Sequence, residues 1–289
     1  FRLDQKQVMA AQVNWQGLQA AASLLHQHYR DVTFAHVGAA DPLDRWTPAV
    51  STAYTWEGLT LRAWYKNIFR APTLNDLYYT QVGNRNLKPE YTKQLNLGVE
   101  YHFDSPHWSA SVQADAYQNK IENRIVCLPL KGTYTWSMMN YGYTFCRGLN
   151  ATAQGRYHTD DWQFSLLGSL TWQRDVNRTD PEDEDTYDKR ICYSPTLSSG
   201  VTAIVGWRSL QFTTSYLYVG ERMWSYADPE DVLKPYHNID MKLTYTLPMD
   251  KTQWGVCLEV CDLLDIQYEH IPRYPMPGRN YKLTLSFGI

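Results

Sequence analysis

Long apolar runs are missing from this sequence. No stretch approaches the roughly 20 apolar residues that a membrane-spanning helix needs, and the mean hydropathy is −0.49. A strong charge of one sign is missing too, because the net charge of the 289 residues is −3. These two absences exclude helical insertion into a bilayer and a basic surface for nucleic acid.

The motifs of common metal and redox sites are also missing. The eight histidines form no HExxH pattern and the five cysteines form no CxxC pair, which excludes metalloprotease, zinc-ribbon and thioredoxin motifs. The odd number of cysteines leaves at least one thiol free or paired outside the chain. Cys127 and Cys146 flank an expected loop and are candidates to pair, whereas Cys257 and Cys261 are too far apart along one strand.

No signal peptide is recognisable, and the chain begins at Phe1. We therefore expect a mature or truncated piece of a protein. The missing signal peptide is then no evidence against export.

Aromatic residues, in contrast, are abundant. They make up 14% of the chain, with 11 Trp and 22 Tyr. This content is typical of proteins with belts of aromatic side chains at the two surfaces of a membrane.

Apolar and polar residues alternate with a period of two along most of the chain, which indicates β-strands that separate two environments. The clearest case is the stretch from Leu59 to Phe103, in which a loop with Pro72, Gly83 and Pro89 joins two alternating strands. The apolar faces of these two strands carry Leu59, Leu61, Ala63 and Tyr65, and then Leu95, Leu97, Val99, Tyr101 and Phe103.

The pattern predicts about 13 strands whose connections alternate in length. Short turns are expected near residues 57, 105, 160, 207 and 250, and long loops near 38, 80, 132, 185, 228 and 270, including one over 122–142. Short turns on one rim and long loops on the other are typical of antiparallel transmembrane β-barrels. Because such barrels usually have an even number of strands, we expect residues 1–289 to be the C-terminal part of a larger one. The alternative is a soluble β-sandwich or lipocalin, with the apolar side chains turned inward.

In a barrel of this kind the apolar faces contact lipid and the polar faces line the lumen. Leu166 and Leu243 should then meet the hydrocarbon. The aromatic belt beside the short turns should contain Tyr101, Phe103, Trp108, Trp162 and Tyr245.

The predicted long loops carry the candidate ligand-binding residues. These are Tyr78, Tyr79, Asn84, Arg85, Trp136, Met138, Met139, Tyr141, Trp224 and Tyr226. Large aromatic and sulfur-containing side chains on loops form binding surfaces, but loops that only pack on one another carry them as well. The acidic run Asp180–Asp185 is a candidate calcium loop, with a solvated loop as the alternative. His237 and His270 are candidate haem ligands, and no catalytic residues are expected.

Two segments resemble the TonB-dependent outer-membrane receptors. Phe69-Arg70-Ala71-Pro72 resembles their FRAP-type box, and Asn84-Arg85-Asn86-Leu87-Lys88-Pro89-Glu90 resembles their NPNLKPE-type box, with Arg85 where the family usually has Pro. The end of the chain, Gly278 to Phe287, resembles the C-terminal signal read by the barrel-assembly machinery. The phrase Asn75-Asp76-Leu77-Tyr78-Tyr79 is similar to the Bacteroidetes branch of the family.

The resemblance implies a 22-stranded barrel in the bacterial outer membrane, with a plug domain that is not in this chain. It implies uptake of a scarce metal chelate energised by the TonB complex, and in some members a surface lipoprotein lid. Cobalamin is favoured over a siderophore or haem. The absence of His from residues 73–83, where haem receptors place one, counts against haem. Two other classes remain as alternatives. An outer-membrane barrel enzyme such as a phospholipase would need a Ser and a His on the lipid-facing side, and a passive porin would need an open lumen.

Overall fold

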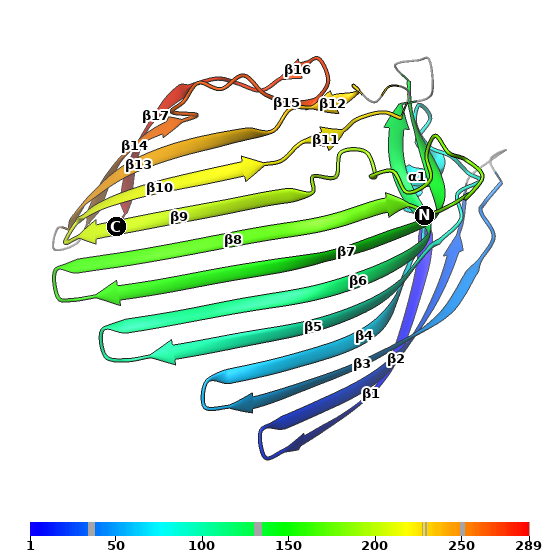
Figure 1. The fold of residues 1–289 in the computed structure, drawn as a ribbon, viewed down its shortest axis with the longest axis horizontal. Helices are drawn as coiled ribbons and strands as arrows, with labels where there is room; N and C mark the ends of the chain where they lie inside the picture. Colours follow the sequence, from blue (N-terminus) through cyan, green and yellow to red (C-terminus); the bar gives the residue numbers. More distant parts are fainter. Residues whose placement is uncertain (34–37, 130–134, 227, 229, 249–251, 289) are drawn as a thin grey trace.

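The main feature of the computed structural model is one curved antiparallel sheet, in which every strand pairs with the next strand of that sheet along the chain (Figure 1). The structure describes residues 1–33, 38–129, 135–226, 228, 230–248 and 252–288. Within these ranges the sheet has 13 strands, as the sequence predicts. They are β1 (Arg2–Trp15), β2 (Leu18–Asp31), β3 (Leu43–Trp56), β4 (Leu59–Arg70), β5 (Glu90–Asp104), β6 (Trp108–Pro129), β7 (Trp136–His158), β8 (Trp162–Asn177), β9 (Leu197–Trp207), β10 (Leu210–Val219), β13 (Tyr236–Pro248), β14 (Gln253–Cys261) and β17 (Asn280–Gly288).

Tight turns join the strands at one rim of the sheet, seen on the left of Figure 1. Gln16-Gly17 and Glu57-Gly58 have positive φ at both residues, 43° and 83° in the first turn and 44° and 84° in the second. Two consecutive residues of positive φ form the type I′ turn whose twist matches that of a hairpin. Gly58 is also required by space, because a Cβ there would lie 2.5 Å from the carbonyl oxygen of His102.

The opposite rim carries longer connections with small elements of their own. These elements are α1 (Leu74–Tyr78), the strand pair β11 (Arg222–Met223) and β12 (Val232–Leu233), and the strand pair β15 (Glu269–Ile271) and β16 (Tyr274–Pro275). The sequence predicts none of them, since each is shorter than the stretch over which a periodicity becomes visible. The expected turn at Pro248 to Asp250 lies partly outside the described residues.

The expected loop over 122–142 is wrong. β6 and β7 continue to pair as far as Pro129 and Trp136, with one irregularity at Asn123, whose φ is 53°. Ladder hydrogen bonds satisfy the backbone of this extension whatever its side chains are. Trp136, Met138, Met139 and Tyr141 therefore lie on a paired extension of the sheet, the projecting β6–β7 hairpin.

Apolar side chains alternate toward one face of the sheet and stay exposed there. Leu97 is 58% exposed, whereas its polar neighbour Asn96 is 7% exposed, and Leu166 on β8 is 55% exposed. The expected belt residues are exposed as well, with Trp108 at 55% and Tyr101 at 50%. A soluble β-sandwich would bury these positions against a second sheet, so that alternative is wrong. In the described part of the chain, no helix is long and apolar enough to span a bilayer, a finding that does not bear on strands.

The expected Cys127–Cys146 disulfide is wrong too, because all five thiols are free. Across β6 and β7, Cys127 lies opposite Met138 and Cys146 lies opposite Asn119. Eight residues of strand separate the two thiols, which is about 26 Å and far beyond the reach of a disulfide.

Candidate functional site

The β4–β5 connection forms the centre of the long-loop rim. Thr73 caps α1 through a capping box, in which the Asp76 amide donates to Thr73 Oγ1 over 3.1 Å and the Thr73 amide donates to the Asp76 carboxylate over 2.9 Å. The chain then reverses at Gly83, whose amide donates to the Tyr79 carbonyl over 2.7 Å. A Cβ at Gly83 would lie 2.6 Å from that same oxygen, so this reversal requires glycine.

The strand ends of β1 and β2 hold one side of this connection through a charged network. Arg2 donates to the Asp31 carboxylate over 2.6 Å and to the Pro72 carbonyl over 2.6 Å. The Tyr78 hydroxyl donates to Asp31 over 3.1 Å and accepts from the Ala40 amide over 2.9 Å. Burial disfavours the charged form of Asp31, but the Arg2 guanidinium and the Tyr78 hydroxyl outweigh it and hold the pKa of this carboxyl below its usual value.

The projecting β6–β7 hairpin holds the other side through two asparagine amides. Asn84 donates to the Met138 carbonyl over 3.0 Å. Asn140 accepts from the Lys88 amide over 2.8 Å and donates to the carbonyl oxygens of Lys88 and Asn123. Between these contacts Leu77, Leu87 and Ile125 form a small buried core, against which Ala40, Tyr78 and Met138 pack. Side chains of neighbouring strands therefore fix the β4–β5 connection in place.

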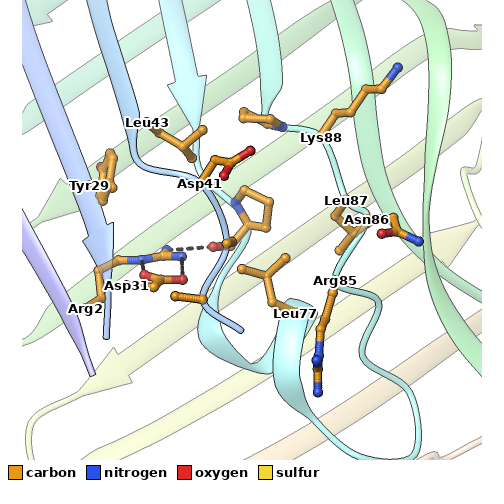
Figure 2. A pocket seen from close by; sticks show the side chains of 14 residues that line it. Arg2, Tyr29, Asp31, Asp41, Leu43, Leu77, Arg85, Asn86, Leu87 and Lys88 are labelled. Carbon is orange, nitrogen blue, oxygen red and sulfur yellow. Dashed lines mark hydrogen bonds and ion pairs between the residues drawn. The ribbon is translucent and has the colours of Figure 1, made fainter. Parts of the chain in front are cut away.

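A hollow of about 440 Å³ lies between the β2–β3 and β4–β5 connections (Figure 2). The walls combine the Arg2–Asp31 pair with the apolar side chains of Leu43, Leu77 and Leu87. Arg85 and Lys88 also line it, and neither has an ion pair in the described part of the chain. The ring of Tyr29 and the carboxylate of Asp41 complete the lining (Figure 2). Mostly apolar walls with these two cations suit a bulky organic ligand that carries negative or carbonyl oxygens.

A second group of candidate residues gathers beneath the β8–β9 connection. The Tyr226 hydroxyl donates to the Arg190 carbonyl over 2.9 Å, and Tyr141 and Cys192 lie beside it. Burial raises the pKa of Tyr141 to about 12 and that of Cys192 to about 11, and it raises the pKa of Tyr226 above its ordinary value. Tyr141 and Tyr226 are half-buried and Cys192 is buried, so this group holds the β8–β9 connection against the sheet.

The predicted site residues thus divide into three sets. The structure places Arg85 in the wall of the hollow. Tyr78, Asn84 and Met138 hold the β4–β5 connection beside it, and Tyr141 and Tyr226 lie together in the second group. Tyr79 is 53% exposed on the rim, Trp136 lies 6.3 Å from the ring of Tyr193, and the Trp224 amide bonds to Asp231 beside β11. Sequence reasoning missed Arg2, Asp31 and Asn140, because no local pattern connects strand ends so far apart in the chain.

The calcium and haem candidates receive no support from their surroundings. Asp180 and Asp183 accept hydrogen bonds from their own turns, including one of 2.6 Å from the Thr186 hydroxyl to Asp183. Nowhere in the described ranges do three His, Cys, Asp or Glu side chains gather closely enough to hold a metal ion. The acidic run therefore fits the solvated loop better than the calcium loop. His270 packs edge-on against Tyr236 and Tyr268, and His237 against Tyr216, outside the hollow.

Four features define a segment of an outer-membrane β-barrel. They are long antiparallel strands, an exposed apolar face, tight turns on one rim and packed loops on the other. The chain belongs to the family described as TonB dependent receptor-like, beta-barrel, whose model matches residues 7–260. It corresponds to the C-terminal portion of such barrels. Barrels of this family lie in the bacterial outer membrane and its members are transporters, so the barrel-enzyme alternative is wrong.

Two curated relatives share the name vitamin B12 transporter BtuB. The protein from Photobacterium profundum is 33% identical over 224 residues, and the one from Vibrio cholerae serotype O1 is 25% identical over 237 residues. These alignments cover 76% and 78% of this chain but only 34% of either relative. This chain therefore spans about a third of the length of the relatives that it matches.

Solved structures of the family share the fold. The ferric preacinetobactin receptor BauA from Acinetobacter baumannii superposes with a TM-score of 0.70 at 14% identity, covering 98% of this chain and 42% of the receptor. The 13-stranded sheet thus corresponds to nearly half of a complete receptor chain.

Proposed function

We propose that this chain is part of an outer-membrane receptor that takes up a scarce metal chelate, with cobalamin as the favoured substrate and the TonB complex as the energy source. The observation that carries the proposal is the alignment, over three quarters of the chain, with proteins named vitamin B12 transporters. An inner-membrane partner must supply the energy, because the outer membrane holds no ATP. Residues 1–289 then form one continuous part of the barrel wall, and a surface lipoprotein lid is a further partner of the same proposal.

The hollow beside the β4–β5 connection is the proposed ligand contact. Arg85 and Lys88 line it without carboxylate partners in the described part of the chain, and exposed Tyr79 lies on the same connection. Cobalamin offers peripheral amides, a phosphate and a flat macrocycle to such a surface. The other polar candidate, Asn84, holds the hairpin through its amide, so we assign it a supporting role.

A ferric siderophore is the second candidate, favoured by the two cations of the hollow. Many ferric siderophores are anions, and their binding to exposed cations weakens as salt screens the charges. Cobalamin with an anionic upper ligand such as cyanide is uncharged overall, so its affinity should change little with salt. The salt dependence of affinity therefore separates the two candidates.

Isothermal titration of the full-length receptor with cobalamin, haem and ferric siderophores tests the proposal. We expect binding of cobalamin that weakens at least about tenfold in the Arg85→Ala variant, a loss of about 1.4 kcal/mol. Arg208→Ala on the opposite rim is the matched control and should bind like the wild type. The proposal fails if the receptor binds none of the three ligand classes, or if planar-bilayer recordings show a steady open channel typical of a porin.

A further inference from the structure

Strands β5 to β8 are neighbours in the sheet (Figure 1). Four cations lie on their outward, apolar face. They are Lys93, Lys120, Arg147 and Arg174, one from each strand, and all are exposed. The next positions down three of these strands on the same face are apolar, at Leu95, Leu149 and Trp172, and the one on β6 is Gln118. The group, hereafter the outward cation cluster, therefore borders the apolar surface of the barrel wall.

The strand register places like charges directly opposite each other. Lys93 pairs with Lys120 across β5 and β6, and Arg147 pairs with Arg174 across β7 and β8. Like charges at directly paired positions destabilise a sheet unless an opposite charge lies between them.

The chain itself supplies little of that opposite charge. Arg174 forms an ion pair of 2.8 Å with Asp188, whereas Lys93, Lys120 and Arg147 have no carboxylate partner in the described ranges. Glu122 lies two residues above Lys120 on the same face and is exposed, without an ion pair to either lysine among the residues that the structure describes. An uncompensated cluster of three cations remains.

The height of the cluster matches a membrane surface. Lys120 lies 12 residues beyond Trp108, where β6 begins at the short-turn rim. A tilted strand climbs roughly 2.4 Å per residue along the membrane normal, so twelve residues climb about 28 Å, close to the height of the apolar band of such barrels. Trp172, 43% exposed, lies just below Arg174 at the position of an aromatic belt. The cluster therefore lies at the level of the lipid headgroups on the long-loop side.

We infer that the outward cation cluster binds the phosphate groups of an anionic lipid in the outer leaflet. Lysine neutralises phosphate as a point charge and arginine donates two parallel hydrogen bonds to it. The acyl chains of the same lipid would lie along Leu95 and Leu149 below, so the site takes both ends of one lipid. This binding site is separate from the proposed uptake function, because it faces away from the lumen.

Native mass spectrometry of the full-length receptor with added lipid A tests this inference. The probes are lipid A with two phosphates and lipid A from which both phosphates have been removed. For the Lys120→Gln/Arg147→Gln double variant we expect at least a tenfold lower affinity for the phosphorylated lipid and an unchanged affinity for the dephosphorylated one. The control is Arg156→Gln, an exposed arginine on the other face of β7, which should leave both affinities unchanged.

Heat-dependent gel mobility of each variant shows whether its barrel is folded. A folded double variant that keeps the affinity of the wild type for phosphorylated lipid A would overturn the inference. An equal loss of affinity for both lipids would overturn it as well, because the contacts would then be apolar. Full competition by millimolar inorganic phosphate would make the cluster a site for soluble anions and also contradict the lipid assignment.

Discussion

At the short-turn rim two residues such as Glu57-Gly58 reverse the chain, whereas at the long-loop rim the connection after β8 runs from residue 178 to 196. The short turns depend on their own backbone geometry, with both φ values positive. The long connections depend on side chains from distant strands, such as Asp31 for α1 and Asn140 for the Asn84–Lys88 turn. The two rims of one sheet are thus held by local and by long-range interactions, respectively.

A charge on the hydrocarbon-facing middle of the barrel wall should have the largest effect. Leu166→Arg puts a guanidinium on the apolar face at a position 55% exposed, and the expected cost is about 2–4 kcal/mol if this face meets hydrocarbon. Urea unfolding in liposomes measures the difference. Ser165→Arg, one residue away on the polar face, is the control and should cost little. If Ser165→Arg proves the more damaging, the polar face rather than the apolar one meets the hydrocarbon.

A side chain added at Gly58, in the tight turn after β3, should lower the free energy of unfolding somewhat less. Gly58→Ala forces a residue with a Cβ into φ +84° and toward the His102 carbonyl, with an expected loss of about 1–3 kcal/mol. Gly155→Ala on β7 is the matched control, since no atom lies within 4 Å of the added carbon. Equal unfolding midpoints for the two variants would show that this rim does not depend on backbone geometry.

Loss of a long-range anchor should affect only the other rim. Asn140→Ala removes three hydrogen bonds to Lys88 and Asn123, and groups left without partners cost about 1–3 kcal/mol locally. Amide hydrogen exchange should become faster over residues 84–88 while β5 and β6 stay protected. Asn150→Ala, exposed on the same strand, should change neither. Faster exchange throughout the sheet in Asn140→Ala would contradict the separation of the rims.

The smallest effect is expected from acid, and again only at the long-loop rim. The folded-state pKa of Asp31 is below its usual value, so its ionised form stabilises the fold above the unfolded-state pKa of about 3.9, and this stability is lost as pH falls through the folded pKa. Hydrogen exchange of residues 73–79 should therefore accelerate below about pH 4. In Asp31→Asn the exchange should be fast at neutral pH and lose this acid dependence. An unchanged acid response in that variant would assign it to another group.

The difference between the rims also explains which predictions from sequence are confirmed. The strands, the tight turns and the apolar face are correct because each depends on residues within a few positions of one another. The loop over 122–142 is wrong because pairing with a partner strand, rather than side-chain preference, decides where a ladder ends. The Cys127–Cys146 disulfide is wrong for the same reason, since the register sets the separation.

By itself, the sequence determined the barrel class, the alternation of short turns with long loops, and the two boxes of the β4–β5 connection. Period-two alternation and turn chemistry are local properties of the chain. Only the tertiary structure decided that Arg85 lines the hollow while Tyr78 and Asn84 hold the connection beside it, and that Tyr141 and Tyr226 lie half-buried elsewhere. It also decided that Lys93 faces Lys120 and Arg147 faces Arg174. The register between strands fixes these neighbours, and a register is set by contacts between segments that the local pattern of either segment does not encode.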